Sequence, residues 1–358
     1  MTRPFVPQAV VDLAHARRDA RVRREWEEAD GYRAQIEAAG WFVVDRGVDF
    51  DLRPARQPDE VADGETRYGS SGSVPSRLDE PDGESPTRVV VVDDAAGVRL
   101  LGAALSAADA AAAGVEAAGT KAAGTEAAGS LVVVANGIGI ELDDDLRGIA
   151  GRGADVVRLA APSAPAVAIN AGCRRATGSV IAILQTGRAH DRSVVDTLVA
   201  ALADPEVGIA GTVGLVSAGL PRFAEATTGP IHAVSGDIAF RRADFRIRGP
   251  LDERYQGRRE LDTWWSLVLR DEPDEDAADD TQAADEAKPQ PDDDDARFEP
   301  GRPPRRAVLV HDRHAVAPMT APRPPESTGG RRDRYRILER FRHRDGLFAE
   351  GTGGADRA

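Results

Sequence analysis

The apolar positions between residues 88 and 310 occur mostly as short continuous runs, separated by segments with helical spacing. A run of apolar residues without polar alternation is typical of a strand buried on both faces, as in a parallel sheet with helical connections. The pattern therefore predicts an α/β domain built on a mostly parallel sheet, with helices on both faces. The predicted strands are Val89–Val92, Leu131–Val134, Val156–Leu159, Val180–Leu184, Val207–Ala210 and Arg305–Val310.

Helical spacing dominates three other stretches. Apolar residues recur at helical positions from Pro7 to Ala39, and Gly40 is a candidate C-cap, so a helical hairpin is predicted there. Trp41–Asp45 is expected to follow it as a short strand. An apolar helix face between the fourth and fifth strands ends before Pro205. Residues 331–348 are predicted to form an arginine-rich helix.

Three segments show neither the continuous apolar runs of buried strands nor helical spacing. Residues 51–87 are rich in Pro, Gly, Ser and Asp and indicate a linker or an extended wrap over the following domain. Glu116–Ser130 consists of a five-residue repeat, EAAGT KAAGT EAAGS, which fits neither strand nor helix and is interpreted as a low-complexity surface connection. Asp271–Asp295 contains thirteen acidic residues, one lysine and no large apolar residue, so disorder is expected.

These signals predict the following organisation of the chain. It comprises an N-terminal helical appendage (1–47), a linker or wrap (48–87), the α/β domain (88–270), an acidic disordered insertion (271–304), a strand and helix that complete the domain (305–348) and a disordered tail (349–358).

Composition changes this interpretation little. The formal charge of −14 comes almost entirely from the acidic segment, so it indicates no general affinity for basic partners. A single cysteine, Cys173, excludes an internal disulfide and a cysteine-based zinc site, and we expect it in the core. Because neither a signal-peptide pattern nor a long apolar run is found, the expected location is the cytoplasm.

Four motifs in order resemble those of family 2 glycosyltransferases of the GT-A fold, over roughly residues 88–271 and 305–348. The motifs are LVVVANGIG (131–139), AVAINAGCRRATGSVIAIL (166–184), VSGDIAFRRADF with GPLDERY (234–255), and RRELDTWWSLVLRD (258–271). The resemblance implies transfer of a sugar, such as a hexosyl group, from a nucleotide diphosphate sugar to an acceptor hydroxyl, with inversion. The acceptor is a carbohydrate, a lipid-linked molecule or a protein.

The metal motif of that family is altered in this chain. In the family an Asp-x-Asp loop holds a divalent cation that neutralises the leaving diphosphate. Here Gln185 and Gly187 stand at the two aspartate positions. Ala135 and Ser266 also replace an aspartate and an arginine that are common in the family. The expected cofactor, Mg²⁺ or Mn²⁺, therefore lacks its usual carboxylates, and donor handling is predicted to be weakly metal-dependent or metal-free.

The remaining donor-side candidates follow predicted strands or begin helices. Asp93 and Asp94 end the first strand, at the sheet edge where open α/β folds bind ligands; alternatively they only make the strand end soluble. Asn136 and Asn170 either orient the nucleotide or cap local turns. Arg188, together with Arg192, is predicted to neutralise the diphosphate in place of a metal.

Acceptor-side candidates occur in the last two motifs. Asp262, followed by Glu260, matches the family's general base; alternatively both carboxylates form the charged first turn of an amphipathic helix. Trp264 and Trp265 either stack on a sugar or belong to the core. Ser235 and Gly236 lie in the motif assigned to the acceptor side.

Two weaker signals remain. His311, with His314, follows the last strand, where a family histidine joins the metal shell; a surface or capping role is the alternative. Residues 23–45 resemble the C-terminal helical tail of cysteinyl-tRNA synthetases, but acidic residues interrupt the arginines, so RNA is not an expected partner. The alternatives to an active transferase are a noncatalytic nucleotide-sugar-binding or scaffold protein and RNA binding through the hairpin.

Overall fold

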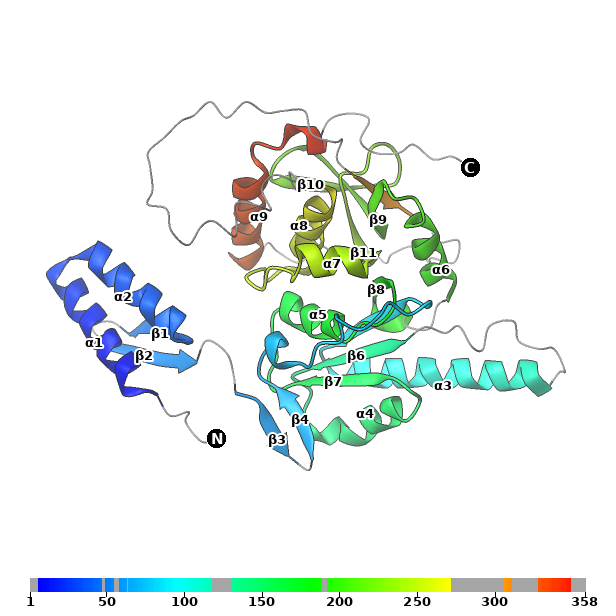
Figure 1. The fold of residues 1–358 in the computed structure, drawn as a ribbon, viewed down its shortest axis with the longest axis horizontal. Coiled ribbons are helices and arrows are strands. Elements are labelled where there is room, and N and C mark those ends of the chain that lie inside the picture. Colours follow the sequence, from blue (N-terminus) through cyan, green and yellow to red (C-terminus); the bar gives the residue numbers. More distant parts are fainter. Residues whose placement is uncertain are drawn as a thin grey trace. The chain divides into compact units, whose positions relative to one another are not determined.

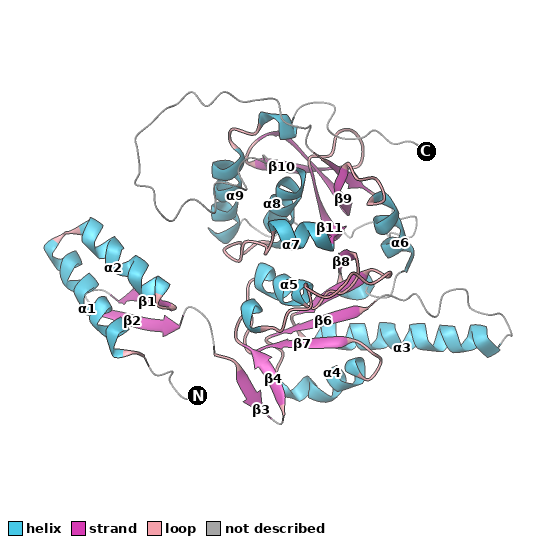
Figure 2. Cartoon of the chain, viewed as in Figure 1, coloured by secondary structure: helices cyan, strands magenta, loops and turns pink. Residues whose placement is uncertain are grey.

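The computed structural model describes residues 6–46, 49–54, 58–62, 64–117, 130–188, 192–271, 305–310 and 328–348. The chain divides into two compact units, residues 1–73 and 74–358, which are coloured along the sequence in Figure 1 and by secondary structure in Figure 2. The repeat between Glu116 and Ser130, the acidic insertion, His311, His314 and the C-terminal tail fall wholly or mostly outside the described residues.

The first unit contains the predicted helical hairpin. It is formed by helices α1 (Gln8–Arg23) and α2 (Trp26–Ala38), and Gly40 follows α2 with a φ of 80°. Strand β1 (Trp41–Arg46) confirms the predicted strand and pairs antiparallel with β2 (Asp49–Pro54). Val10, Ala14, Ile36 and Trp41 form its small core. The range interpreted as a linker also contains β3 (Glu60–Ala62), β4 (Glu65–Tyr68) and the 3-10 helix η1 (Ser71–Ser73).

The second unit is a mixed α/β domain around a mostly parallel sheet, as the apolar runs predict. Four mutually parallel strands lie in the order β7-β6-β5-β8, and β11, β9 and β12 continue the sheet, with β11 antiparallel. The strands are β5 (Thr87–Val92), β6 (Leu131–Asn136), β7 (Asp155–Leu159), β8 (Val180–Leu184), β9 (Val207–Gly219), β10 (Arg222–Ala226), β11 (Ala233–Arg241) and β12 (Arg306–Leu309).

Helices cover both faces of this sheet (Figure 1). Alternate strand residues such as Val90 and Val133 pack in one apolar cluster with side chains of α3, α4 and α6. On the other face, α5 lies so close that a Cβ on Gly172 would stand 2.4 Å from Val89 Cγ1. The helices are α3 (Ala95–Ala117), α4 (Asp143–Ala150), α5 (Pro165–Arg174), α6 (Arg192–Ala201), α7 (Arg242–Arg248), α8 (Arg258–Arg270) and α9 (Thr328–Phe341), with 3-10 helices η2 (Ile140–Leu142), η3 (Thr186–Arg188) and η5 (Asp345–Phe348).

Two element boundaries differ from the sequence prediction. The fifth strand, β9, does not stop at Ala210 but runs to Gly219, because it pairs with β11 on one side and with β12 and then β10 on the other. The C-terminal helix ends at Phe341 rather than at Phe348. The chain turns there, with the amide of Arg344 donating to the carbonyl of Phe341, and continues into η5.

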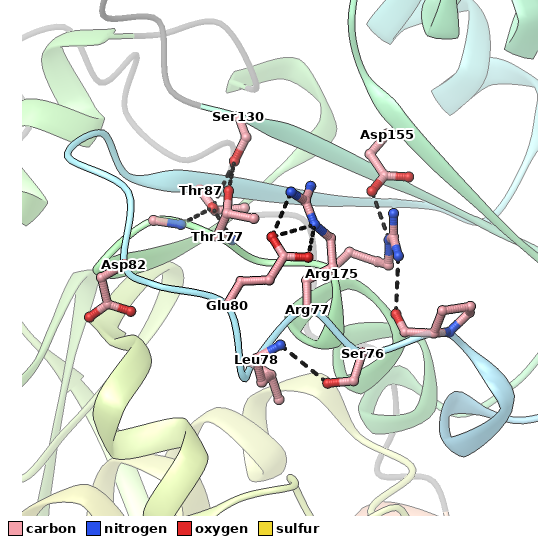
Figure 3. A network of polar contacts seen from close by, with 12 residues as sticks. Ser76, Arg77, Leu78, Glu80, Asp82, Thr87, Ser130, Asp155, Arg175 and Thr177 are labelled. Carbon is pink, nitrogen blue, oxygen red and sulfur yellow. Dashed lines mark hydrogen bonds and ion pairs between the residues drawn. The ribbon is translucent and has the colours of Figure 1, made fainter.

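A polar network fixes the amino ends of the parallel strands (Figure 3). The Arg175 guanidinium donates to Asp155 at the start of β7 and to the carbonyl of Pro75. The Thr87 hydroxyl at the start of β5 lies 2.7 Å from that of Ser130 and accepts the amide of Thr177. This edge of the sheet is therefore closed by internal bonds, which leaves the opposite, carboxyl edge for a ligand.

Candidate functional site

The strand order reverses at β5, and this reversal marks the candidate site. From β5 the chain moves to β6 and β7 on one side, and then returns to β8 on the other side of β5. In open α/β sheets ligands bind outside the carboxyl ends of the strands at such a switch point. Asp93 follows β5, Asn136 ends β6, and Gln185 follows β8. The structure therefore brings these predicted donor-side residues to one edge.

Asp93 and Asn136 are in direct contact at this edge. Asn136 Nδ2 donates to Asp93 Oδ1 at 2.7 Å and to the carbonyl of Ser163 at 3.0 Å, while its Oδ1 accepts the Ser163 amide. Asn136 is buried, whereas Asp93 is exposed. Asn136 therefore holds the loop after β7 in place and orients the Asp93 carboxylate, which is the group that solvent and ligands reach.

Two further donor-side candidates, Asp94 and Asn170, form hydrogen bonds within the protein. Asp94 Oδ1 accepts the amide of Gly97 at 2.7 Å and so caps the first turn of α3. Asn170 is buried in α5, where it donates to the carbonyl of Leu251 and accepts the Leu251 amide. Asp94 therefore has a capping role that the sequence analysis did not assign to it. Asn170 links α5 to the loop before α8, and its side chain is occupied there.

A β-bulge in β11 directs two polar side chains to opposite sides of the site. The pairing of β11 with β9 shifts register between Ser235 and Ile238, and Gly236 adopts a φ of 86°. Bulges change the direction of side chains and occur next to active sites. Ser235 Oγ donates to Asp262 Oδ2 in α8, whereas Asp237 Oδ1 accepts the amide of Gln185 at the end of β8.

Asp237 is a buried carboxylate that the sequence analysis missed. Its side chain has no exposure, and its Oδ2 lies 3.2 Å from Arg188 Nη1. Gln185 and Arg188 come from the altered metal motif, so a carboxylate from a different strand reaches the position next to that motif. A lone acidic residue within the apolar run of β11 was the available signal, because a charge inside a buried strand requires a partner.

The described residues at this edge offer few free ligands for the divalent cation that the family resemblance implies, while residues 189–191 and His311 lie outside the described part of the chain. Mg²⁺ and Mn²⁺ sites need freely available carboxylate or carbonyl oxygens. Here the Asp237 carboxylate is already bound by a backbone amide and compensated by the Arg188 guanidinium. In the described part of the chain, no group of three or more His, Cys, Asp or Glu side chains is arranged to hold a metal ion. Arg188 supplies positive charge at this edge instead.

The two predicted base candidates lie in different environments. Asp262 is 1% exposed, accepts from Ser235 Oγ at 2.8 Å and from Arg258 Nε at 2.7 Å, and is thus fully occupied. Burial raises the pKa of the Asp262 carboxyl, although Arg258, Ser235 and the Gly236 amide oppose this shift. These contacts join α8 to the bulge of β11, so Asp262 has a structural role at this position.

Glu260 is partly exposed and lines a cleft of about 1710 Å³. The walls of this cleft come from α8, α9 and the β9–β10 hairpin, and the donor-side candidates are not among its lining residues. The Glu260 carboxylate folds over Gly257, where an added Cβ would stand 2.3 Å from Oε2. Asp333 of α9 accepts the amides of Gln256 and Gly257, so the segment that leads into α8 is held without Glu260.

Both tryptophans of α8 are core residues. Trp265 is fully buried and packs edge-on against Phe240 at 5.4 Å, and Trp264 is 5% exposed between Tyr255 and Arg340. The prediction that they form the floor of a sugar subsite is therefore corrected in favour of the core alternative, because every residue of α8 from Leu261 to Arg270 is buried. Cys173 is also buried, and burial raises the pKa of its thiol.

The bulge should be sensitive to a side chain at Gly236. We expect Gly236→Ala to lower the free energy of unfolding by about 1–3 kcal/mol, because a φ of 86° disfavours alanine and its Cβ would stand 2.7 Å from Thr212 Oγ1. Urea denaturation of both variants measures the change. Gly229→Ala is the matched control, since its φ of 90° carries the same strain with open space around it. An equal loss in the two variants would show that steric contact at the bulge is unimportant.

Comparison with known proteins yields structural similarity only. No protein-family model matches the sequence, and no curated protein matches it. Among solved structures, the chain is similar to residues 1–349 of TarS from S. aureus (TM-score 0.36, 13% identity, covering 52% of this chain and 55% of that chain). It is also similar to GalNAc-T7 with UDP, GalNAc and Mn²⁺ (TM-score 0.37, 12% identity, covering 52% and 40%).

Both similar proteins are GT-A-type glycosyltransferases. The chain spans about half the length of the first of these structures and less of the second, and the likeness extends to their general α/β architecture only.

Among the described residues, every helix is too short or too polar to cross a bilayer.

Proposed function

We propose that this chain is a glycosyltransferase that uses a nucleotide diphosphate sugar, with the donor at the carboxyl ends of β5, β6 and β8. The observation that carries the proposal is the meeting of Asp93, Gln185 and the Arg188–Asp237 pair at the switch point of the sheet. The four ordered sequence motifs, which resemble those of family 2 glycosyltransferases, support the same assignment.

On the donor side, Arg188 acts in place of a metal ion. As the bond between sugar and diphosphate breaks, negative charge grows on the leaving phosphate, and a fixed guanidinium stabilises that charge. Asp237 holds Arg188 against the end of β8, so the cation is positioned before the donor arrives. Asp93, oriented by Asn136, is the carboxylate available to accept hydrogen bonds from hydroxyl groups of the nucleoside or sugar.

On the acceptor side, Glu260 acts as the general base. A carboxylate that accepts the proton of the attacking hydroxyl must reach a space open to the acceptor. Glu260 lines the cleft, whereas both oxygens of Asp262 are bonded inside the protein. Transfer requires an acceptor that extends from this cleft to the donor edge, with its hydroxyl beside both Glu260 and the donor sugar. Attack by this hydroxyl forms the new glycosidic bond, the nucleoside diphosphate leaves, and the hydroxyl proton passes to Glu260.

The proposal is tested by binding and turnover on the full chain. Thermal shifts with a panel of nucleotide sugars, with and without Mn²⁺, identify a donor, and release of nucleoside diphosphate then measures transfer or slow hydrolysis. Stabilisation by a donor together with release supports the enzyme. Stabilisation without release under any acceptor mixture supports the noncatalytic nucleotide-sugar-binding alternative, and absence of any nucleotide effect overturns the assignment of the donor site.

We expect Arg188→Gln to weaken binding of a nucleoside diphosphate about tenfold, because one charge-assisted contact to the diphosphate is lost. Isothermal titration calorimetry with UDP and GDP measures the change. Arg246→Gln, an exposed arginine on α7, is the matched control and should bind as the original chain does. Unchanged affinity in Arg188→Gln would remove Arg188 from the donor site.

A further inference from the structure

The cleft beside Glu260 carries a strong excess of positive charge. Five arginines line it, together with Glu260 as the acidic residue of the lining. They come from the start of β10, from α8 and from α9: Arg222, Arg259, Arg331, Arg334 and Arg342. A cleft lined by charge of one sign concentrates the field and attracts ligands of the opposite sign.

Most of this charge is available to a ligand. Arg259 is compensated by Glu225, to which its guanidinium donates at 2.6 Å. In contrast, Arg222, Arg331 and Arg342 are exposed and have no carboxylate partner within the described ranges. Arg331 lies on the face of α9 that also presents Tyr335 and Leu338 to the cleft, at helical spacing, and Arg342 directly follows this helix.

A buried histidine adds an unpaired donor to the same cleft. His232 lines the cleft and is only 4% exposed. Its Nδ1 accepts the amide of Ser217 at 3.0 Å, so the neutral ring carries its proton on Nε2. Burial, and then the charge of Arg270, lower the pKa of His232 and favour this neutral form. Nε2 has no hydrogen-bond partner in the described part of the chain, and a buried donor of this kind needs an acceptor oxygen, which water or a ligand can supply.

We propose that this cleft binds a phosphate group of the glycosyl acceptor, so that the acceptor is a phosphate-bearing molecule. The inference rests on the proposed function and assigns the acceptor's chemical class. Guanidinium groups bind phosphate through paired, charge-assisted hydrogen bonds, which a neutral sugar does not need. The arginines also compensate the repulsion between an incoming phosphate and the Glu260 carboxylate, which must be close to the attacking hydroxyl.

The test uses the full chain with inorganic tripolyphosphate as the probe, measured by calorimetry. An Arg188→Gln background reduces the contribution from the donor edge. In that background we expect Arg331→Gln/Arg342→Gln to lower the affinity by about tenfold per arginine. Arg332→Gln is the matched control, because Arg332 is an exposed neighbour on α9 that does not line the cleft. Equal affinity of the double variant and the control overturns the proposal, as does absence of tripolyphosphate binding to the Arg188→Gln chain.

Two further arms complete the test. Titration with UDP of Arg331→Gln/Arg342→Gln in the chain that retains Arg188 separates the two proposals: retained UDP binding with lost tripolyphosphate binding supports the cleft, while loss of UDP binding alone concerns the donor site. Vesicles of phosphatidylcholine with and without phosphatidic acid distinguish the source of the phosphate. A chain that binds tripolyphosphate and vesicles with phosphatidic acid, but not vesicles without it, has a lipid-borne acceptor. Binding to tripolyphosphate alone assigns a water-soluble acceptor.

Discussion

Replacing Glu260 by glutamine is expected to reduce the rate of sugar transfer by about 10²–10⁴-fold, the usual contribution of a general base. Glutamine preserves the shape of the side chain but cannot take the proton of the attacking hydroxyl. Donor binding should be unchanged, because Glu260 lies in the cleft and not at the carboxyl ends of β5, β6 and β8. The rate of nucleoside diphosphate release with saturating donor and acceptor measures the effect.

The stability of this variant separates catalysis from a structural role. Glu260 lies in the first turn of α8, where a negative charge contributes only about 0.3–1 kcal/mol through the helix dipole. Asp333 accepts the amides of Gln256 and Gly257, so the segment that leads into α8 is held without Glu260. A large loss of rate with a small loss of stability is therefore the expected combination for the Glu260→Gln chain.

Controls make the assignment of the base decisive. Glu339→Gln, an exposed glutamate on α9 outside the cleft, should leave transfer unchanged. Asp262→Asn should mainly reduce stability, since it weakens the contact with Arg258 in a buried position. If Asp262→Asn instead abolished transfer at unchanged stability while Glu260→Gln remained active, the base would be Asp262, as the motif alone suggests.

The architecture and the donor edge could be predicted from the sequence because they depend on one-dimensional signals. Continuous apolar runs indicate strands buried on both faces, and polar residues directly after such strands must gather at one edge of a parallel sheet. Asp93, Asn136 and Gln185 follow this rule. Asn170 does not, because it lies within α5, and its partner Leu251 is far away in the sequence.

The parts of the site that the sequence did not reveal depend on pairing and burial. Asp237 reaches Gln185 only because β11 pairs antiparallel with β8 and contains a bulge. The sequence motif ranks Asp262 before Glu260, but the two lie on one short helix, and which face of α8 is open depends on how α9 packs against it. That contact, made by Asp333, joins residues more than seventy positions apart.

Replacing Arg270 by methionine is expected to lower the free energy of unfolding by about 3–5 kcal/mol, because a buried donor group is removed from several carbonyl acceptors at once. Arg270 has no exposure. Its guanidinium donates to the carbonyls of Arg305, His232 and Leu347, which belong to separate segments of the second unit. Burial lowers its pKa to about 10, so the group remains charged at neutral pH and its bonds are charge-assisted.

Urea denaturation measures this change, with Arg332→Gln as the surface control. Arg270→Lys should be intermediate, since a single ammonium retains the charge but cannot reproduce the planar fork that reaches three carbonyls. We expect the substitution to disturb the cleft as well. Leu347 precedes Phe348, a residue that lines the cleft, and the carbonyl of His232 belongs to another lining residue. Methionine should therefore also weaken tripolyphosphate binding at temperatures where the chain is still folded. Wild-type stability of Arg270→Met would mean that water replaces the guanidinium at these carbonyls.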